Sequence, residues 1–309
     1  MLTHSALVIF GLLPLCLAFT NTEVYNVTLA VYSGAPDPVW TVTLPKGQII
    51  DANTNDPNDL PQRLGYKGLI VQSGKKARLI VGPKTTKLQL QLLDTIPGNL
   101  LSTPYLKHIR SEINSGAVKA STSSQRSARN APPYEPNRWR GIRRICNNCY
   151  NYANNKALNN FAQPGFNRPG DIPPNPTHLT QFARRILAAA ERDGLTRLAL
   201  NGPVPVDPGP GDNRHVVALF ALAGGGDFHW YRLDANGRWS HKVGEAAVCD
   251  FDNSHNPITD PRNATRGPLG YQFVAFMYSN PAVTIAGPPN ICCRKLFLNA
   301  MSCVQGQVN

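Results

Sequence analysis

The stretch Ile145–Ala153, which reads Ile-Cys-Asn-Asn-Cys-Tyr-Asn-Tyr-Ala, most narrowly constrains how this chain can fold. Asn147 and Asn148 favour the N-cap of a helix, because a short amide side chain accepts hydrogen bonds from the unpaired N–H groups of the first turn. With Asn148 as the cap, Cys149 lies in the first turn, where the positive end of the helix favours a thiolate over a thiol. The stretch therefore predicts a helix that begins at Cys149 and presents a cysteine nucleophile.

The same residues support other interpretations. Cys146 and Cys149 have the C-x-x-C spacing of a small disulfide, half of a zinc site or a redox pair. A zinc site that combined them with His229 and His241 would match no compact finger, so we expect no metal and no cofactor. Beyond the first twenty residues the cysteine count is even, and three disulfides in an oxidising compartment would leave no free thiol. These cysteines are Cys146, Cys149, Cys249, Cys292, Cys293 and Cys303.

The first twenty residues predict a signal peptide. Residues 1–20 contain no Lys, Arg, Asp or Glu and carry an apolar run from Ala6 to Phe19. The run is too short for a membrane span, and no later segment is long enough. We therefore expect a secreted, soluble mature protein without a membrane span.

The charge of the chain predicts acidic partners. The formal net charge is +12, and about +5 of it falls on residues 111–144. Such a basic segment favours binding to acidic extracellular polymers or matrix proteins, and for a secreted protein nucleic acid is the least favoured partner.

The chain divides into two expected domains. Residues 21–113 predict a β-rich accessory domain, with strands at 24–32, 39–44, 65–72, 77–81 and 88–93 and a short helix at 102–113. Residues 114–140 lack apolar periodicity and predict a basic flexible linker. Residues 141–309 form the second domain.

In the second domain the pattern predicts an α+β fold with helices packed on an antiparallel sheet. Apolar residues recur at helical spacing over 177–193. Strands are expected at 215–222, 248–251 and 271–278. A hairpin is expected from 227–233 to 238–242, because Asn236-Gly237 between them is a strong turn signal.

The candidate catalytic pair is Cys149 with a histidine of this hairpin. In papain-like and cell-wall-hydrolase-like folds, the nucleophile heads a helix packed on an antiparallel sheet and a neighbouring strand supplies its base. His229 is the first choice for the base and His241 the second. A lone histidine on a strand is, however, more often a hydrogen-bonded structural residue, and this interpretation applies to each of the two.

Two further roles complete the candidate site. Asp250 is the expected residue that orients the base, with Asp252 and Asn253 as alternatives. Gln163, or backbone N–H groups near Cys149, would stabilise an oxyanion.

Four segments together resemble a family of secreted proteins, some of whose animal members are similar to proteins of the shell or extracellular matrix. They are Cys146-x-x-Cys149-Tyr-Asn-Tyr-Ala, Gln163-Pro-Gly165, His229-Trp-Tyr-Arg-x-Asp-x-x-Gly-x-Trp-Ser-His241-Lys and Ile258-x-Asp-Pro261. The likeness covers roughly residues 138–278 and implies a shared fold and a secreted setting.

Two functions are therefore expected. The first is an extracellular or matrix-associated protein that keeps a Cys/His hydrolase-like domain and binds acidic polymers through its basic surface. The alternative is a cysteine peptidase, amidase or acyl transferase that acts on peptides through Cys149 and His229.

Overall fold

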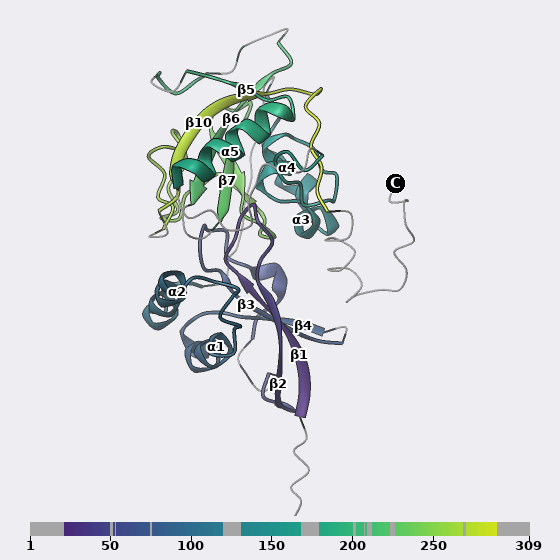
Figure 1. Ribbon diagram of the computed structural model, residues 1–309, viewed down its shortest axis with the longest axis vertical. Coiled ribbons are helices and arrows are strands. Elements are labelled where there is room, and N and C mark those ends of the chain that lie inside the picture. Colours follow the sequence, from purple (N-terminus) through teal and green to yellow (C-terminus); the bar gives the residue numbers. More distant parts are fainter. Residues whose placement is uncertain are drawn as a thin grey trace, which may run out of the picture.

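The computed structural model describes residues 22–49, 52, 54–74, 76–119, 131–167, 179–199, 202–206, 208, 212–222, 226–267 and 270–288. The expected signal peptide and three of the cysteines, Cys292, Cys293 and Cys303, lie outside the described residues. Two regions follow one another along the chain and stack end to end (Figure 1). We call residues 22–118 the N-terminal region and residues 131–288 the C-terminal region.

The N-terminal region is an antiparallel sheet with two helices beside it (Figure 1). Its strands are β1 (Thr22–Ala30), β2 (Val39–Pro45), β3 (Gly68–Ser73) and β4 (Lys76–Ile80), in the order β2-β1-β3-β4. One short 3-10 turn, Pro57–Asp59, precedes β3. A second, Pro83–Thr85, leads into α1 (Thr86–Leu93), and α2 (Thr103–Ser115) follows.

The strand expected at 88–93 is wrong, because these residues belong to α1. Alternating Leu and Gln imitate the period of a strand. The buried positions, however, are Thr85, Gln89, Leu92 and Leu93, which have helical spacing. Gln89 belongs to the buried face because its side chain is satisfied there, donating to the Gly82 carbonyl at 2.8 Å.

The C-terminal region is a mixed sheet-and-helix unit, which agrees with the expected α+β class. Its sheet is antiparallel and has the order β5-β10-β6-β7-β8-β9. The strands are β5 (Thr196–Arg197), β6 (His215–Leu222), β7 (Asp227–Leu233), β8 (Trp239–Lys242), β9 (Val248–Cys249) and β10 (Gln272–Ser279). The helices are α3 (Ile142–Cys146), α4 (Cys149–Ala153) and α5 (Leu179–Arg192), with a 3-10 turn at Pro136–Trp139.

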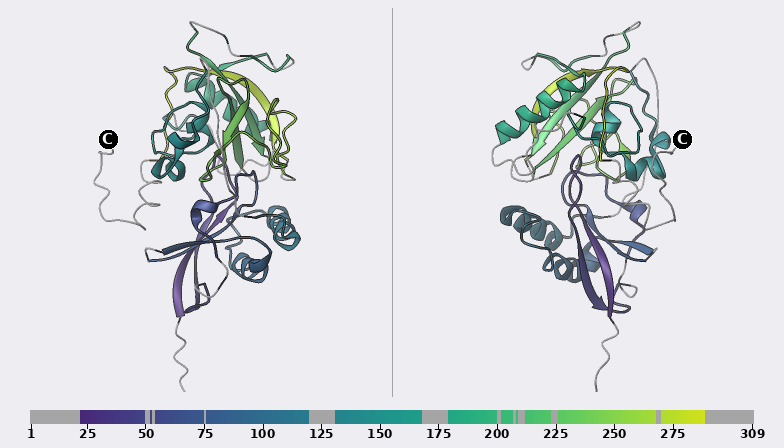
Figure 2. Two further views of the ribbon diagram at one scale, coloured as in Figure 1. Left: turned by 180° about the vertical axis from the view of Figure 1, so that it is seen from behind. Right: turned by 45° about the vertical axis from the view of Figure 1, so that its right-hand side comes forward.

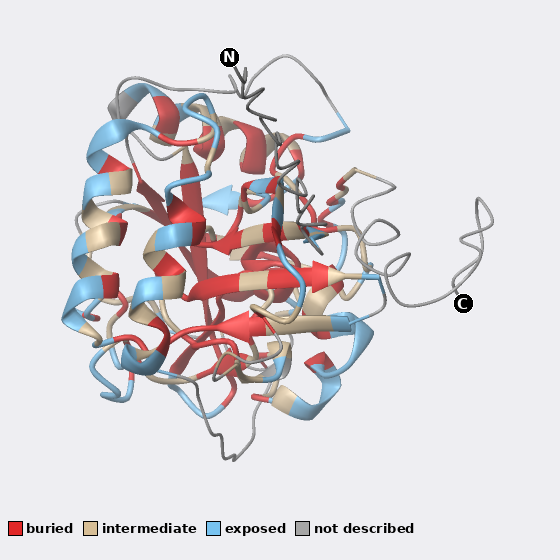
Figure 3. Cartoon of the chain, turned by 90° about the horizontal axis from the view of Figure 1, so that it is seen from below, coloured by how far each residue is buried: buried red, intermediate tan, exposed pale blue. Residues whose placement is uncertain are grey.

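Helices cover the sheet of the C-terminal region. Helix α5 lies across it (Figure 2), and its Phe182 and Ile186 share a core with Val217 and Leu219 of β6. Every residue of β6, β7 and β8 is buried, whereas helices of the chain keep one exposed side (Figure 3). Both faces of these strands are therefore covered. No described helix is long and apolar enough to cross a membrane.

Part of the expected linker is packed structure. Tyr134 and Trp139 are buried and form a small core with Tyr152 and Val248. The expectation of flexibility does not hold for residues 131–139, because two aromatic rings anchor them to the C-terminal region. Residues 120–130 lie outside the described part of the chain.

The two regions meet through loops of the N-terminal region that reach into the C-terminal region (Figure 1). One loop, residues 31–38, joins β1 to β2. A second precedes β3, and there the Leu64 N–H donates to the Asn253 side chain at 3.0 Å. Lys67 connects the loops, since its Nζ donates to the Tyr32 carbonyl at 2.7 Å. The first loop reaches the candidate site.

Candidate functional site

Cys149 begins helix α4, as the sequence predicts. The Asn148 side chain accepts from the N–H groups of Tyr150 and Asn151 at 3.0 and 3.1 Å, and the Asn151 side chain accepts from the Asn148 N–H in return. This reciprocal cap fixes the start of a helix that is only five residues long.

Lys242, the last residue of the His-to-Lys motif, holds the backbone that precedes this cap. Its buried Nζ donates to the carbonyls of Arg144, Asn147 and Gly244. A buried ammonium normally needs such partners, and here it satisfies carbonyls at the end of α3. The motif on β8 thereby positions the cysteine on α4.

The two histidines of the hairpin contact each other. His229 Nε2 lies 2.7 Å from His241 Nδ1, and His241 Nε2 lies 3.0 Å from the Phe251 carbonyl oxygen. Asp250 is the residue expected to orient the base, but among the described contacts its carboxylate reaches neither ring: His229 contacts His241, and His241 contacts a backbone carbonyl. The two rings meet because His229 lies on β7, His241 lies on β8, and these two strands are paired directly.

Both imidazoles are held neutral. Burial lowers the pKa of His229 well below its usual value, and neighbouring His241 lowers it further. Burial lowers the pKa of His241 to about 4. A carbonyl only accepts, so His241 carries its proton on Nε2 and accepts from His229 Nε2–H through Nδ1. The remaining nitrogen of His229, Nδ1, is then a free acceptor.

A serine of the N-terminal region is hydrogen-bonded to that nitrogen. Ser33 Oγ lies 2.5 Å from His229 Nδ1, and hydrogen bonding by the Ser33 side chain lowers the pKa of Cys149 against the larger effect of burial. The hydroxyl therefore occupies the ring nitrogen of His229, the residue that the sequence pairs with Cys149 as its base.

The thiolate expected at Cys149 is not favoured. Burial, followed by the charge of Asp227, raises the pKa of Cys149 to about 12. The side chain is fully buried, and its Sγ lies 3.8 Å from the Phe228 carbonyl. A one-turn helix supplies only a weak dipole, so desolvation determines the protonation state.

Gln163, the expected oxyanion donor, is at the site and donates to a carbonyl. Its Nε2 lies 2.8 Å from the Gly34 carbonyl oxygen, and Asn148 Nδ2 lies 3.0 Å from the same atom. Two side-chain amides therefore converge on one carbonyl oxygen beside Cys149. Such a pair of donors is the arrangement that stabilises an oxyanion in acyl transfer.

Asp227 holds the same loop from the other side. Its carboxylate accepts from the N–H groups of Ser33, Gly34 and Ala35 at 2.7, 2.9 and 2.8 Å, and from the Tyr271 hydroxyl. Burial raises the pKa of Asp227 above its usual value, and these donors oppose the shift.

Sequence reasoning missed Ser33, Gly34 and Asp227. The Ser33–Asp227 contact joins residues 194 positions apart, and no local pattern signals a pairing over that distance. The turn residues at 33–38 predict only that the chain bends there. The Asp227 carboxylate that the bend contacts belongs to the other sheet.

The described cysteines are not joined to one another. Cys149 and Cys249 are free and buried, whereas Cys146 is disulfide-bonded. The Cys-x-x-Cys pair therefore does not close on itself. Within the described ranges, no three His, Cys, Asp or Glu side chains are grouped so as to hold a metal ion.

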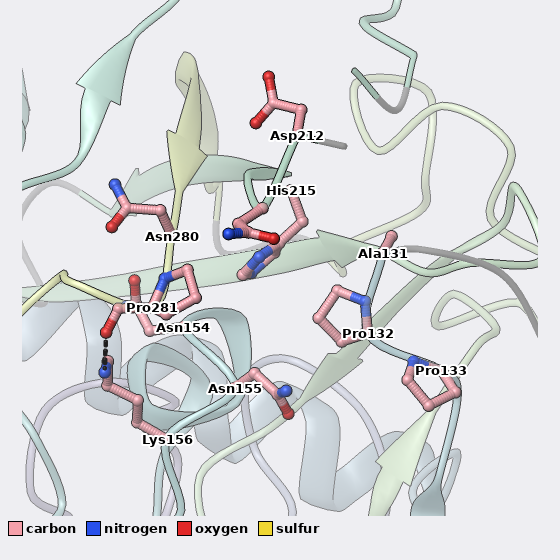
Figure 4. A pocket seen from close by; sticks show the side chains of 11 residues that line it. Ala131, Pro132, Pro133, Asn154, Asn155, Lys156, Asp212, His215, Asn280 and Pro281 are labelled. Atoms are coloured by element: carbon pink, nitrogen blue, oxygen red, sulfur yellow. Dashed lines mark hydrogen bonds between the residues drawn. The ribbon is translucent and has the colours of Figure 1, made fainter. Parts of the chain in front are cut away.

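A polar pocket of about 660 Å³ lies at the other end of α4 (Figure 4). Asn154, Asn155 and Lys156 line it together with His215. Lys156 Nζ donates to the Pro281 carbonyl at 2.8 Å, and His215 Nε2 lies 2.7 Å from the Ala153 carbonyl. The lining contains neither Cys149 nor His229, so this pocket gives no access to the Cys/His pair.

Fold and site together define an α+β protein with a closed Cys/His centre. No family model matches the chain, and no solved structure matches it. Insoluble matrix shell protein 1 of Ruditapes philippinarum is 35% identical over 154 residues, which are 49% of this chain and 93% of the shell protein. The chain belongs to the family of that shell matrix protein.

Proposed function

We propose that this chain is a structural component of an extracellular matrix and that its C-terminal region is a non-hydrolytic scaffold. The observation that carries the proposal is the similarity to Insoluble matrix shell protein 1, which extends over 93% of that protein. The secretory character of residues 1–20 is compatible with this setting.

The geometry of the Cys/His pair also favours a scaffold over a hydrolase. Cys149 is fully buried with a raised pKa, and the Ser33 hydroxyl occupies Nδ1 of His229. A nucleophile in this state has neither a thiolate nor room for an external substrate.

We further propose that the protein binds acidic matrix polymers through exposed arginines. Arg138, Arg140 and Arg143 are exposed within six residues of each other, on and after the 3-10 turn that precedes α3. Opposite charge on a polymer would attract this cluster over about 8–10 Å at physiological salt.

Salt-gradient elution from an immobilised acidic polysaccharide tests this binding. Replacing all three arginines by Gln is expected to move elution to clearly lower salt. The matched control replaces exposed Lys46, Arg184 and Arg238 by Gln, which removes the same charge at dispersed positions and is expected to shift elution less. Equal shifts for the two triple variants would reduce the effect to net charge and contradict a specific cluster.

A cysteine peptidase or amidase is the second candidate. The converging amides of Asn148 and Gln163 favour it, because they would polarise a substrate carbonyl next to Cys149. This function requires that the N-terminal loop leave the site. Fast labelling of Cys149 by iodoacetamide near neutral pH in the folded wild-type chain would favour this candidate over the scaffold.

A further inference from the structure

The segment Ser33–Ala35 makes contacts to the C-terminal region that resemble those of a bound ligand. Its three successive N–H groups surround the carboxylate of Asp227, and its central carbonyl accepts from Asn148 and Gln163. Side chains of the C-terminal region therefore pair with all three N–H groups of the segment and with its central carbonyl.

Most of these contacts are made to the main chain. Consecutive N–H groups that converge on an anion form a nest, which a bent segment provides whatever its side chains. Elsewhere in the loop of residues 31–38, Asp37 supports the bend, since its Oδ1 accepts from the N–H groups of Val31 and Tyr32 at 2.9 and 2.7 Å. The loop therefore arrives already bent.

Selectivity comes from the space around Gly34. A Cβ at this position would lie 2.2–2.6 Å from three ring carbons of Phe228. Gly34 is not in the left-handed region of φ, so the glycine is required by the close approach of the ring and not by backbone strain. The neighbouring Ser33 supplies the hydroxyl that bonds His229.

We propose that the C-terminal region carries a peptide-binding cleft beside Cys149 and His229. Its ligand is a bent main-chain segment with glycine after serine, and the chain's own Ser33–Ala35 segment occupies the cleft in cis. Peptides of the same chemistry compete for the cleft when the cis segment is displaced. The proposal does not depend on the matrix function.

The cis segment would weaken the binding of an outside peptide to the intact chain. A tethered ligand acts at an effective concentration on the order of mM, and apparent affinity in trans falls with the fraction of open clefts. Displacing the segment is therefore expected to tighten the binding of an outside peptide relative to the wild-type chain.

The experiment uses the full chain with Gly34→Ala, which drives a methyl group into the Phe228 ring. Gly98→Ala is the matched control, because a Cβ at Gly98 meets nothing within 4 Å. The probe is a fluorescent synthetic peptide of residues 32–38, Tyr-Ser-Gly-Ala-Pro-Asp-Pro, and its partner peptide has alanine in place of the glycine. Fluorescence polarisation measures binding, and iodoacetamide measures the reactivity of Cys149.

The Gly34→Ala chain is expected to bind the glycine peptide at least about tenfold more tightly than the wild-type and Gly98→Ala chains do, and to discriminate against the alanine peptide. Its Cys149 is expected to be labelled faster, and bound peptide is expected to slow the labelling. A folded Gly34→Ala chain that binds neither peptide would overturn the proposal and reduce the contact to ordinary packing. Equal binding of both peptides would overturn the selectivity for glycine.

A second variant covers failure of Gly34→Ala to fold. Ala35→Asp changes a partly exposed residue and places a carboxylate beside Asp227, so that like charges expel the segment without overfilling the core. The same peptide binding is expected, and near-UV circular dichroism checks that the rest of the chain is folded. Absence of binding in this folded variant would also overturn the proposal.

Discussion

Replacing Arg232 by Met removes one partner of a fully buried ion pair. The guanidinium lies 2.7 Å from Asp234, and the two side chains are 1% and 0% exposed. Arg232 also donates to the Tyr152 hydroxyl at 2.9 Å and lies 4.1 Å above the Tyr152 ring centroid. The pair therefore joins β7 to α4, the helix that begins at Cys149.

The expected loss is large because Asp234 is left buried without its counter-charge. Removing one member of a buried pair costs about 3–5 kcal/mol of unfolding free energy, whereas replacing both members by apolar residues is often nearly neutral. Arg232→Met is therefore expected to lose about 3–5 kcal/mol, and Arg232→Met/Asp234→Leu is expected to recover much of that loss.

Urea unfolding followed by tryptophan fluorescence measures the change, since Trp139, Trp230 and Trp239 are buried in the same region. The control is Arg197→Met, which breaks an exposed pair whose side chains are 43% and 36% exposed; its expected cost is below about 1 kcal/mol. Equal losses for Arg232→Met and Arg197→Met, or a double variant less stable than Arg232→Met, would refute the reasoning.

Two other substitutions test buried charges near the site. Burial raises the pKa of Asp37 from 3.8 to about 6, so its ionised form destabilises the fold by at most about 3 kcal/mol above pH 6. Wild-type stability relative to Asp37→Asn is thus expected to rise as pH falls from about 6 to about 4, and a flat difference between the two urea midpoints would contradict this. Lys242→Met leaves the carbonyls of Arg144, Asn147 and Gly244 without their donor and is expected to lose about 3 kcal/mol. Lys46→Met, at an exposed position, is the control, and equal urea midpoints for these two variants would show that the buried ammonium contributes nothing.

The elements of the C-terminal region followed from local patterns. The cap at Asn148, the Asn236-Gly237 turn and the continuous apolar run of β6 each specify an element through nearby residues. In the N-terminal region the alternation of Leu and Gln predicted a strand where the chain forms α1. The reason is that a glutamine with internal hydrogen-bond partners can occupy the buried face of a helix.

The candidate site was only partly predictable. Local pattern placed Cys149 at a helix start and both histidines on one hairpin. The protonation states and the closure of the site depend on burial and on Ser33, which belongs to a different sheet and a distant part of the chain. Desolvation of a thiol arises from the whole tertiary structure, so a helix-start argument alone gave the wrong direction for the pKa of Cys149.

The contact between the Ser33–Ala35 loop and its cleft also bears on assembly. The loop belongs to the N-terminal region and its partners Asp227, Asn148 and Gln163 to the C-terminal region, so the hydrogen bonds between them would be the same within one copy or between two. Exchange between copies would be head-to-tail, and head-to-tail contacts that do not close into a ring continue indefinitely. A chain that makes this contact within one copy at low concentration is thus expected to exchange it between copies and to form filaments at high concentration.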